Sequence, residues 1–163
     1  MSDQQAIDVR AFRDALGAFA TGITIVTTQD ASGRKAGLTV NSFSSVSLAP
    51  PLVLWSIDRE SNVFDAFNES DYFNVHVLAD HQRSLSERFS GADVDRFDGV
   101  SLEQGVNAAP LIAGCLARFQ CQKVHQYDGG DHLIMVGNVL RFDRSDQQPL
   151  LYFSGQYSQI AQS

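Results

Sequence analysis

The sequence predicts a mainly β protein, an antiparallel barrel or sandwich. Six or seven segments either alternate apolar and polar residues or are rich in β-branched residues, as strands are. Most of these segments are joined by short turns or by one small helix, whereas a parallel sheet needs repeated helical crossovers. No internal repeat or linker divides the chain. We therefore expect one domain over residues 1–163, with its core at about 9–157.

Three short helices are predicted along the chain. Asp8 can cap the first helix with its side chain. The apolar residues that follow recur on one helical face at spacings of three and four: Val9, Phe12, Leu16 and Phe19. Ser61 can cap a second helix that runs to Phe67, and Asp80 a third that runs to about Phe89.

The strands are predicted from alternation, from β-branched residues and from the turn residues between them. In chain order they cover residues 22–28, 35–41, 52–57, 72–78, 115–127, 132–142 and 150–153. Pro50 and Pro51 cannot lie inside a central strand, so they mark the start of the third. The Asp128–Asp131 segment holds Asp-Gly and Gly-Asp, which are typical of a β-hairpin. The Ser90–Pro110 segment has no clear pattern and predicts a long excursion.

The charge balance and the cysteines limit the possible partners and the compartment. Twelve basic and nineteen acidic residues give a net charge of −7, which argues against nucleic acid and against an anionic membrane surface. No apolar run is long enough to span a bilayer, and the first residues do not have the pattern of a secretory signal. Cys115 and Cys121 lie too far apart along one predicted strand to form a disulfide with each other. These features predict a cytoplasmic protein.

The segment Ala36–Ser56 combines small hydrogen-bonding residues with apolar anchors. Within Thr39–Ser47, six of nine residues carry a hydroxyl or an amide group: Thr39, Asn41, Ser42, Ser44, Ser45 and Ser47. Val40, Phe43 and Val46 interrupt them regularly. A serine-rich surface loop explains the hydroxyl groups but not these interruptions. The pattern therefore favours one wall of a site for a flat ligand with polar edges.

Three common kinds of chemistry find no support in the sequence. There is no Gly-x-Ser-x-Gly elbow for a nucleophilic serine. The four histidines and two cysteines have none of the spacings typical of zinc sites, so no metal is expected. His76 alternates with valines in a predicted strand, and we expect it to be exposed or hydrogen-bonded. No glycine loop of the Rossmann or Walker type is present.

If a nucleotide binds, its phosphate must be held by hydroxyl groups, backbone amides and nearby cations. Arginine suits this task because its planar fork can donate two hydrogen bonds to one phosphate. The nearby cations are Arg34, Lys35 and Arg59. Each of them alone is better explained as a solvated residue of a turn.

His132 follows two glycines at the start of a predicted strand. An imidazole at the rim of a barrel can hydrogen-bond a ligand, stack on a ring or act as an acid. The turn by itself favours an ordinary hairpin, which explains every residue type in it.

Taken together, the segments resemble the short-chain flavin reductase family, the small reductase components of two-component flavin monooxygenases. The resemblance runs from about Phe12 to Tyr157. It rests on six segments in order: FRDALGAFATGITIVTT, GLTVNSFSSVSLAPPLVLWSI, YFNVHVL, RFSG, GGDHLIMVGNV and PLLYFSGQY. It implies a split β-barrel with a few short flanking helices, and a homodimer. It also implies a flavin near the dimer interface, with NADH or NADPH bound against the flavin.

The resemblance implies roles for particular residues. The residues that would line the flavin are Gly37, Leu38, Thr39, Val40, Asn41, Ser42, Ser47, Leu54, Trp55, Ser56 and Phe89. Ser61 and Asn62, at a helix start, would help to hold the ribityl-phosphate tail. Asp131 and His132 would lie at the nicotinamide, with Tyr157 nearby. His132 is the expected catalytic residue.

The implied activity is that of an NAD(P)H:flavin oxidoreductase, which reduces FMN or FAD and supplies the reduced flavin to a separate monooxygenase. Hydride transfer needs two stacked rings and the exclusion of water, but neither a nucleophile nor a metal. One alternative is a non-catalytic flavin- or haem-binding barrel. Another is an oxidase of the pyridoxamine-phosphate type, which would need a stronger basic cluster. The choice between FMN and FAD stays open, and by charge alone the candidates to bind the 2′-phosphate of NADPH are Arg83, Arg88 and Arg96.

Overall fold

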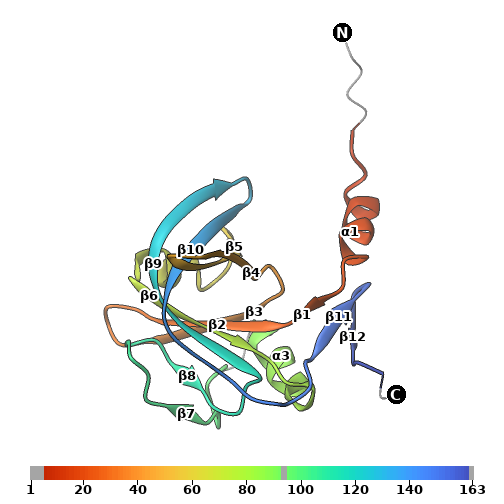
Figure 1. The fold of residues 1–163 in the computed structure, drawn as a ribbon. Helices are drawn as coiled ribbons and strands as arrows, with labels where there is room; N and C mark the ends of the chain where they lie inside the picture. Colours follow the sequence, from red (N-terminus) through yellow and green to blue (C-terminus); the bar gives the residue numbers. More distant parts are fainter. Residues whose placement is uncertain (1–5, 93–94, 162–163) are drawn as a thin grey trace.

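The computed structural model describes residues 6–92 and 95–161 and has an antiparallel β architecture (Figure 1). Seven strands form the main sheet in the order β3-β2-β6-β9-β10-β5-β4. Every pairing within it is antiparallel. The sheet curls strongly, and α3 and the C-terminal strands lie beside one end of it. The predicted class, mainly β and antiparallel, is confirmed.

The elements have the following bounds. The strands of the main sheet are β2 (Thr24–Gln29), β3 (Lys35–Val40), β4 (Ser44–Leu48), β5 (Pro51–Asp58), β6 (Tyr72–Val77), β9 (Ala117–Gly129) and β10 (His132–Arg144). A three-stranded sheet contains β1 (Thr21–Gly22), β11 (Leu151–Phe153) and β12 (Gln156–Ser158), and a third sheet pairs β7 (Leu102–Glu103) with β8 (Leu111–Ile112). The helices are α1 (Val9–Gly17), α2 (Phe64–Glu69), the 3-10 turn η1 (Asp80–Gln82) and α3 (Arg83–Ser90). None of them is long and apolar enough to cross a membrane within the described residues.

The predicted strands are present, but several boundaries differ. The hairpin of β9 and β10 extends further than predicted, so that only Gly130 and Asp131 remain between the strands. Gly130 has a φ of +79°, a conformation that glycine adopts at little cost. Four strands were not predicted: β4, β7, β8 and β12. All four are short, and β4 and β12 are rich in polar residues and are stabilised by pairing with a neighbour rather than by an apolar pattern.

The helix starts were predicted with mixed success. The Asp8 carboxylate accepts hydrogen bonds from the backbone N–H groups of Arg10 and Ala11 at 2.9 and 3.3 Å, which confirms it as the cap of α1. The prediction for Ser61 is wrong, because α2 begins three residues later, at Phe64. Ser61 lies instead in the turn that joins β5 to the helix. The third predicted helix is divided into η1 and α3, and the Asp80 side chain caps neither.

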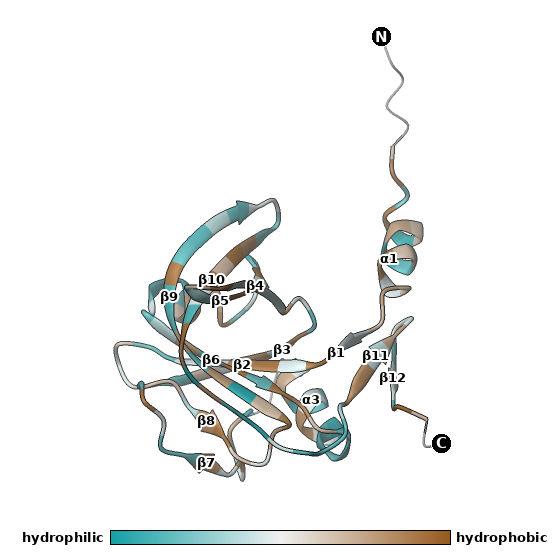
Figure 2. Ribbon diagram, in the orientation of Figure 1, coloured by the Kyte–Doolittle hydropathy of each residue, from teal (hydrophilic) through white to brown (hydrophobic). Residues whose placement is uncertain are grey.

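Helix α1 stands apart from the main sheet (Figure 1). None of its residues is buried, and its apolar side is solvent-exposed in the single chain (Figure 2). The exposed fractions on that side are 66% for Val9, 53% for Phe12 and 58% for Leu16. Because the apolar side of α1 is uncovered, no burial of apolar surface within this chain stabilises the helix.

Two apolar clusters form the core. One lies inside the curled sheet and contains Trp55, whose ring meets Phe67 and Phe73 edge-on at centroid distances of 4.9 and 5.8 Å. The other lies between the sheet, α3 and the C-terminal segment, and it contains Ile25 and Phe89. These clusters place α3 and β3 side by side, which sets the position of the cleft described below.

His76 lies in the middle of β6 and is fully buried. Its Nδ1 lies 2.9 Å from the Ile25 carbonyl oxygen, and its Nε2 accepts the backbone N–H of Ile112 at 3.0 Å. The expectation of a hydrogen-bonded histidine is confirmed, whereas the alternative of an exposed one is wrong. Alternation in the sequence predicts that the His76 face of β6 is exposed to solvent. The second apolar cluster covers this face, so both faces of the strand are buried.

The Ser90–Pro110 excursion is tied to the sheet by Arg118. The guanidinium of this β9 residue pairs with Asp143 at 2.9 Å and with Glu103 of β7 at 2.7 Å. It also donates a hydrogen bond to the Ile112 carbonyl oxygen of β8 at 3.1 Å. Residues 95–110 of the excursion therefore pack over one end of β6 and β9.

Candidate active site

A cleft opens between β3, α3 and the C-terminal strands. It encloses about 200 Å³, and the residues that line it are Ile23, Thr39, Val40, Asn41, Ser86, Ser90, Tyr152 and Tyr157. Four of these, Thr39, Val40, Asn41 and Tyr157, were predicted as cofactor-binding residues. The structure thus brings the hydroxyl-rich segment and the C-terminal tyrosine to the same place.

The cleft continues towards α1. A second cavity of about 450 Å³ shares Asn41 and Tyr152 with the first, and its other walls include Leu16 and Phe19 from the N-terminal segment and Gly155 from the C-terminal turn. Asn41 therefore lies where the two cavities meet. A flat ligand that rests against Asn41 can extend into either of them.

Two hydroxyl groups of the predicted wall are already used by the fold. Thr39 donates to the Ser86 carbonyl oxygen at 2.7 Å. Ser42 donates to the Ser56 carbonyl oxygen at 3.2 Å and accepts the Ser56 N–H at 2.9 Å, which completes the edge of β5 beyond the end of β4. Within the described residues the exposed Asn41 side chain forms no hydrogen bond. Its amide is therefore free to bind the polar edge of a ligand.

One outward face of the sheet carries several of the other predicted residues. In the register of β5, β10 and β9, Ser56 pairs with Ile134, and His132 pairs with Asp58. Leu54 lies on the same face, because strand residues two apart point to the same side. His132 and Ser56 are thus diagonal neighbours, roughly 7–8 Å apart between Cα atoms. The loop after β3 joins this face to the cleft, because Asn41 lines the cleft and Ser42 is bonded to Ser56.

The tip of the β9–β10 hairpin is held by Arg59. Its guanidinium pairs with Asp128 at 2.6 Å and donates to the Gly130 carbonyl oxygen at 3.1 Å, and its backbone N–H donates to the Asp131 carbonyl oxygen. This arginine was considered as a phosphate-binding cation. In the structure its side chain is committed to the hairpin instead.

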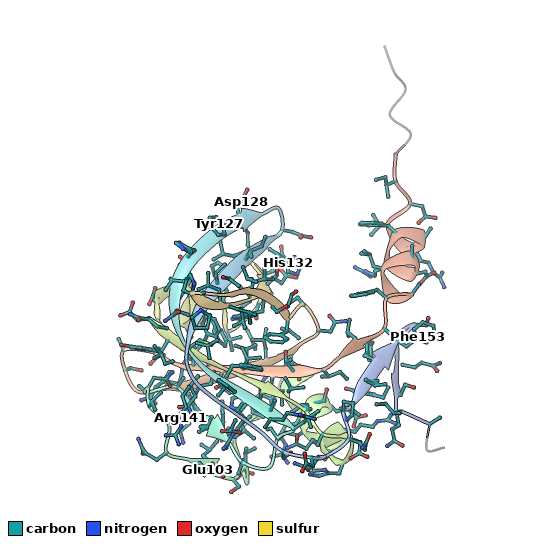
Figure 3. All side chains as sticks on the ribbon, in the orientation of Figure 1. Glu103, Tyr127, Asp128, His132, Arg141 and Phe153 are labelled. Atoms are coloured by element: carbon teal, nitrogen blue, oxygen red, sulfur yellow. The ribbon has the colours of Figure 1, made fainter. Side chains whose placement is uncertain are left out.

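His132 is half-exposed at this tip, with 42% of its side chain accessible to solvent (Figure 3). Its Nδ1 lies 2.7 Å from the Asp131 carboxylate. The hydrogen bond with His132 lowers the pKa of the Asp131 carboxyl group. An ionised carboxylate accepts hydrogen bonds only, so Nδ1 carries the proton and Nε2 is left to face a ligand.

A third cavity, of about 290 Å³, lies at the other end of β3. Gly37, Asn62 and Arg96 line it together with Arg34 and Lys35. Arg96 donates to the carbonyl oxygens of Gly37 and Gly91 at 2.6 and 2.7 Å and to the Asn62 side chain at 3.3 Å. Burial lowers the pKa of Arg96. This cavity is a cationic pocket at which Asn62, one of the two predicted phosphate-tail residues, is present.

Several predicted residues do not line these cavities. Trp55 and Phe89 are fully buried in the core. Trp55 points to the opposite side of β5 from Leu54 and Ser56, because alternation divides three consecutive strand residues between the two faces. Phe89 packs on Gly37, where a Cβ atom would lie 2.7 Å from its ring. The other predicted residues outside the three cavities are Leu38, Ser47 and Ser61, together with Ser42, Leu54, Ser56, Asp131 and His132 described above.

His132 and Tyr157 do not meet within one chain. In the view of Figure 1 the hairpin tip lies at the top of the molecule and β12 at its right, and none of the three cavities is lined by both residues. The expectation that Tyr157 lies near the nicotinamide stays a prediction. Any ligand that touches both must bridge two parts that the fold keeps apart.

The sequence reasoning missed several residues that the structure places in the cavities, among them Ser86 and Tyr152. Tyr152 could have been found, because it pairs with Tyr157 across a two-residue turn and strand partners share a face. Ser86 carries no local signal, and Arg96 was a candidate by its charge alone, for the 2′-phosphate of NADPH. Their positions depend on the packing of α3 and of the excursion against β3.

These features define a class of protein. A mainly antiparallel barrel whose cleft is lined by neutral hydrogen-bonding groups and tyrosine rings, with a cationic pocket on the same strand, is suited to binding a nucleotide-like cofactor. Within the described residues, no group of three His, Cys, Asp or Glu side chains could hold a metal ion.

Comparison with known proteins identifies the family. Residues 16–161 match the flavin reductase like domain. The chain is 45% identical over 152 residues to "FMN reductase (NADH) SmoA" of Agrobacterium fabrum, covering 93% of this chain and 86% of that protein. It is 40% identical over 157 residues to "Flavin-dependent monooxygenase, reductase subunit HsaB" of Rhodococcus jostii, covering 96% and 80%.

A solved structure agrees with this assignment. The NADH:FAD oxidoreductase of Streptomyces globisporus, in complex with NAD and FAD fragments, superimposes with a TM-score of 0.89 at 34% identity, over 96% of this chain and 97% of that chain. The chain belongs to the flavin reductase like family. The resemblance read from the six sequence segments is confirmed, and with it the split-barrel fold and the prediction of an oxidoreductase of the flavin reductase type.

Proposed function

We propose that this protein transfers a hydride from NADH to FMN or FAD and supplies the reduced flavin to a separate monooxygenase. The observation that carries this proposal is the cleft at Asn41, where a free amide and two tyrosine rings surround a narrow space. Flavin supplies the hydride acceptor when bound. The protein supplies the position of the two rings and the exclusion of water.

The chemistry of the cleft fits an isoalloxazine ring. The edge of that ring presents carbonyl oxygens and ring nitrogens, which neutral donors satisfy, and its faces are apolar. The Asn41 amide and the backbone of Thr39–Asn41 meet the edge, while Tyr152 and Tyr157 supply aromatic surface. Among the residues that the structure describes, no charged side chain lines this cavity, which is consistent with modest affinity and release of the flavin after reduction.

The cationic pocket fits the phosphate end of the same ligand. Gly37 lines this pocket and Asn41 lines the ring cleft, and four residues of extended chain span roughly 13 Å. A ribityl chain can follow β3 over this distance. Lys35, Arg96 and the Asn62 amide then surround the phosphate, and the role predicted for Asn62 is retained on this basis.

His132 is proposed to bind the nicotinamide. Asp131 fixes the orientation of the imidazole, so that the unprotonated Nε2 can accept a hydrogen bond from the N–H group of the nicotinamide carboxamide. Since His132 and the Tyr157 cleft are apart in one chain, we propose that a second copy brings them together. The site is then completed in a homodimer.

The exposed apolar side of α1 supports the homodimer. A second copy that covers Val9, Phe12 and Leu16 removes from water the largest apolar area that this helix presents. Both cysteines are buried as free thiols, which supports the predicted cytoplasmic location.

Replacing Leu16 by Asp is expected to halve the particle mass measured by light scattering. Leu16 is 58% exposed in the single chain, so the substitution leaves the fold of the monomer intact, but it places a charge in the proposed interface. The matched control is Ala11→Asp, which adds the same charge on the opposite side of the same helix. Equal masses for wild type and Leu16→Asp at all concentrations would exclude α1 from the interface.

The activity is tested by following NADH oxidation with FMN or FAD. We expect a rate well above that of NADH and flavin alone, which saturates with flavin at concentrations far above that of the protein. Saturation at one flavin per chain would indicate a tightly bound prosthetic group instead. A rate equal to the background would contradict the proposed function and favour a flavin carrier. Repeating the assay with NADPH measures the preference for the donor.

A further inference from the structure

Ser86 of α3 is a fully buried serine that contacts both walls of the cleft. Its hydroxyl group lies 3.0 Å from the Tyr157 hydroxyl on β12. Its carbonyl oxygen accepts the Thr39 hydroxyl of β3 at 2.7 Å. Thr39 and Tyr157 belong to two different sheets and come from opposite ends of the chain. Ser86 is a direct hydrogen-bonded link between them.

The Tyr157 ring is fixed by more than this hydroxyl contact. The Arg83 guanidinium lies over the ring at 4.7 Å from its centroid, and Tyr152 meets it edge-on at 5.7 Å. Arg83 is itself held by Glu87 one helical turn further on, at 2.9 Å. A tyrosine that is held at its hydroxyl, on one face and at its edge has one available orientation.

The link also fixes the Ser86 backbone. Its carbonyl oxygen accepts a second hydroxyl group, that of Ser90, at 2.9 Å. The two acceptor positions of this oxygen are therefore both used, and the helix cannot shift along β3 without breaking a bond. The separation of Thr39 from Tyr157 is consequently set by one side chain and one carbonyl group of the same residue.

We infer that Ser86 is a positioning residue that sets the width of the cleft for the flat ring of a bound flavin. The inference rests on the flavin reductase function proposed above, because the ring is the ligand. Ser86 acts through Tyr157 and Thr39. A narrow, preformed slot binds a flat ring more tightly than a slot whose wall must first be ordered.

The test is the affinity for riboflavin, which has the ring but no phosphate, measured by the quenching of its fluorescence. Ser86→Ala and Tyr157→Phe each remove the same hydrogen bond, so each should raise the Kd by about 10-fold. The double variant should raise it no further, because the second substitution has nothing left to remove. Ser84→Ala is the matched control, an exposed serine on the same helix that points away from the cleft, and its Kd should equal that of wild type.

A purely structural role for Ser86 makes a different prediction. It would lower the melting temperature but leave the Kd unchanged at a temperature at which circular dichroism shows every variant to be folded. Three results would each overturn the inference. They are an unchanged affinity in both single variants, additive effects in the double variant, and no binding of riboflavin by wild type. Since binding is measured without NADH, a protein that binds riboflavin through Ser86 but fails to oxidise NADH would contradict the proposed activity alone.

Discussion

Replacing His132 by Ala is expected to lower kcat/KM for NADH by about 100-fold, the size typical of a lost acid or hydrogen-bonding group at a reacting centre. The Kd of the flavin should stay within about twofold of wild type, because His132 belongs to the hairpin tip and not to the cleft at Asn41. Steady-state NADH oxidation and fluorescence titration with FMN measure the two quantities separately.

The reason lies in the geometry of the tip. The Asp131 carboxylate holds Nδ1 at 2.7 Å, and Arg59 ties the turn to the end of β5 through Asp128 and Gly130. The imidazole therefore presents Nε2 in a fixed direction. Asp131→Asn keeps the size of the side chain but weakens this restraint, so we expect an effect of the same kind but about 10-fold smaller.

The control is His125→Ala, which removes an exposed imidazole from the same hairpin but further from its tip. It should leave both kcat/KM and the Kd unchanged. If His132→Ala instead weakened flavin binding and left the reaction of bound flavin intact, the histidine would belong to the flavin site, and the proposed position of the nicotinamide would be wrong.

The strands were predictable because their signals are local. Alternation in the Tyr72–Leu78 segment and the Asp-Gly turn before His132 require no knowledge of distant residues. Strand β4 was missed because its serines resemble a loop, and only its pairing with β5 makes it a strand. Ser61 was misplaced for a related reason, since a serine three residues before a helix satisfies the same pattern as a cap.

The candidate site was predictable only in part. The stretch from Thr39 to Ser47 was identified as unusual, and the structure brings its residues Thr39, Val40 and Asn41 to a cleft. The hydroxyl groups of Thr39 and Ser42, however, bind the backbone of Ser86 and Ser56 rather than remaining free. Composition shows that hydrogen-bonding groups are present, but their partners depend on which elements pack together.

Trp55 is a second residue whose surroundings could not be predicted from the sequence composition. Its neighbours Leu54 and Ser56 face outwards, so the side chains of three consecutive strand residues cannot all lie on the same face of the strand. Ser86 could not be found from sequence at all, and Arg96 only by its charge, because the chain brings them to β3 from positions 47 and 59 residues away. Residues of this kind become visible only when the packing of α3 is known.

The stability of the protein is expected to fall by about 3 kcal/mol as the pH is lowered from above 6.5 to about 4, through His76 alone. Burial lowers the pKa of His76 from 6.5 to about 4. The folded state therefore binds the proton less well than the unfolded chain. The stabilisation is complete above pH 6.5, decreases as the unfolded chain takes up the proton, and is lost once the pH falls through 4.

The hydrogen bonds explain why the folded state resists the proton. Nδ1–H donates to the Ile25 carbonyl oxygen, so Nε2 must accept the Ile112 N–H and has no room for a proton of its own. Protonation would break the bond to Ile112, beside the positive charge of Arg118. Urea unfolding across this pH range measures the free energy of unfolding of wild type and of His76→Gln. The difference between the two should be largest above pH 6.5 and should decrease towards pH 4. A difference that stays constant with pH would show that His76 does not titrate on unfolding, and that its role is confined to packing and hydrogen bonding.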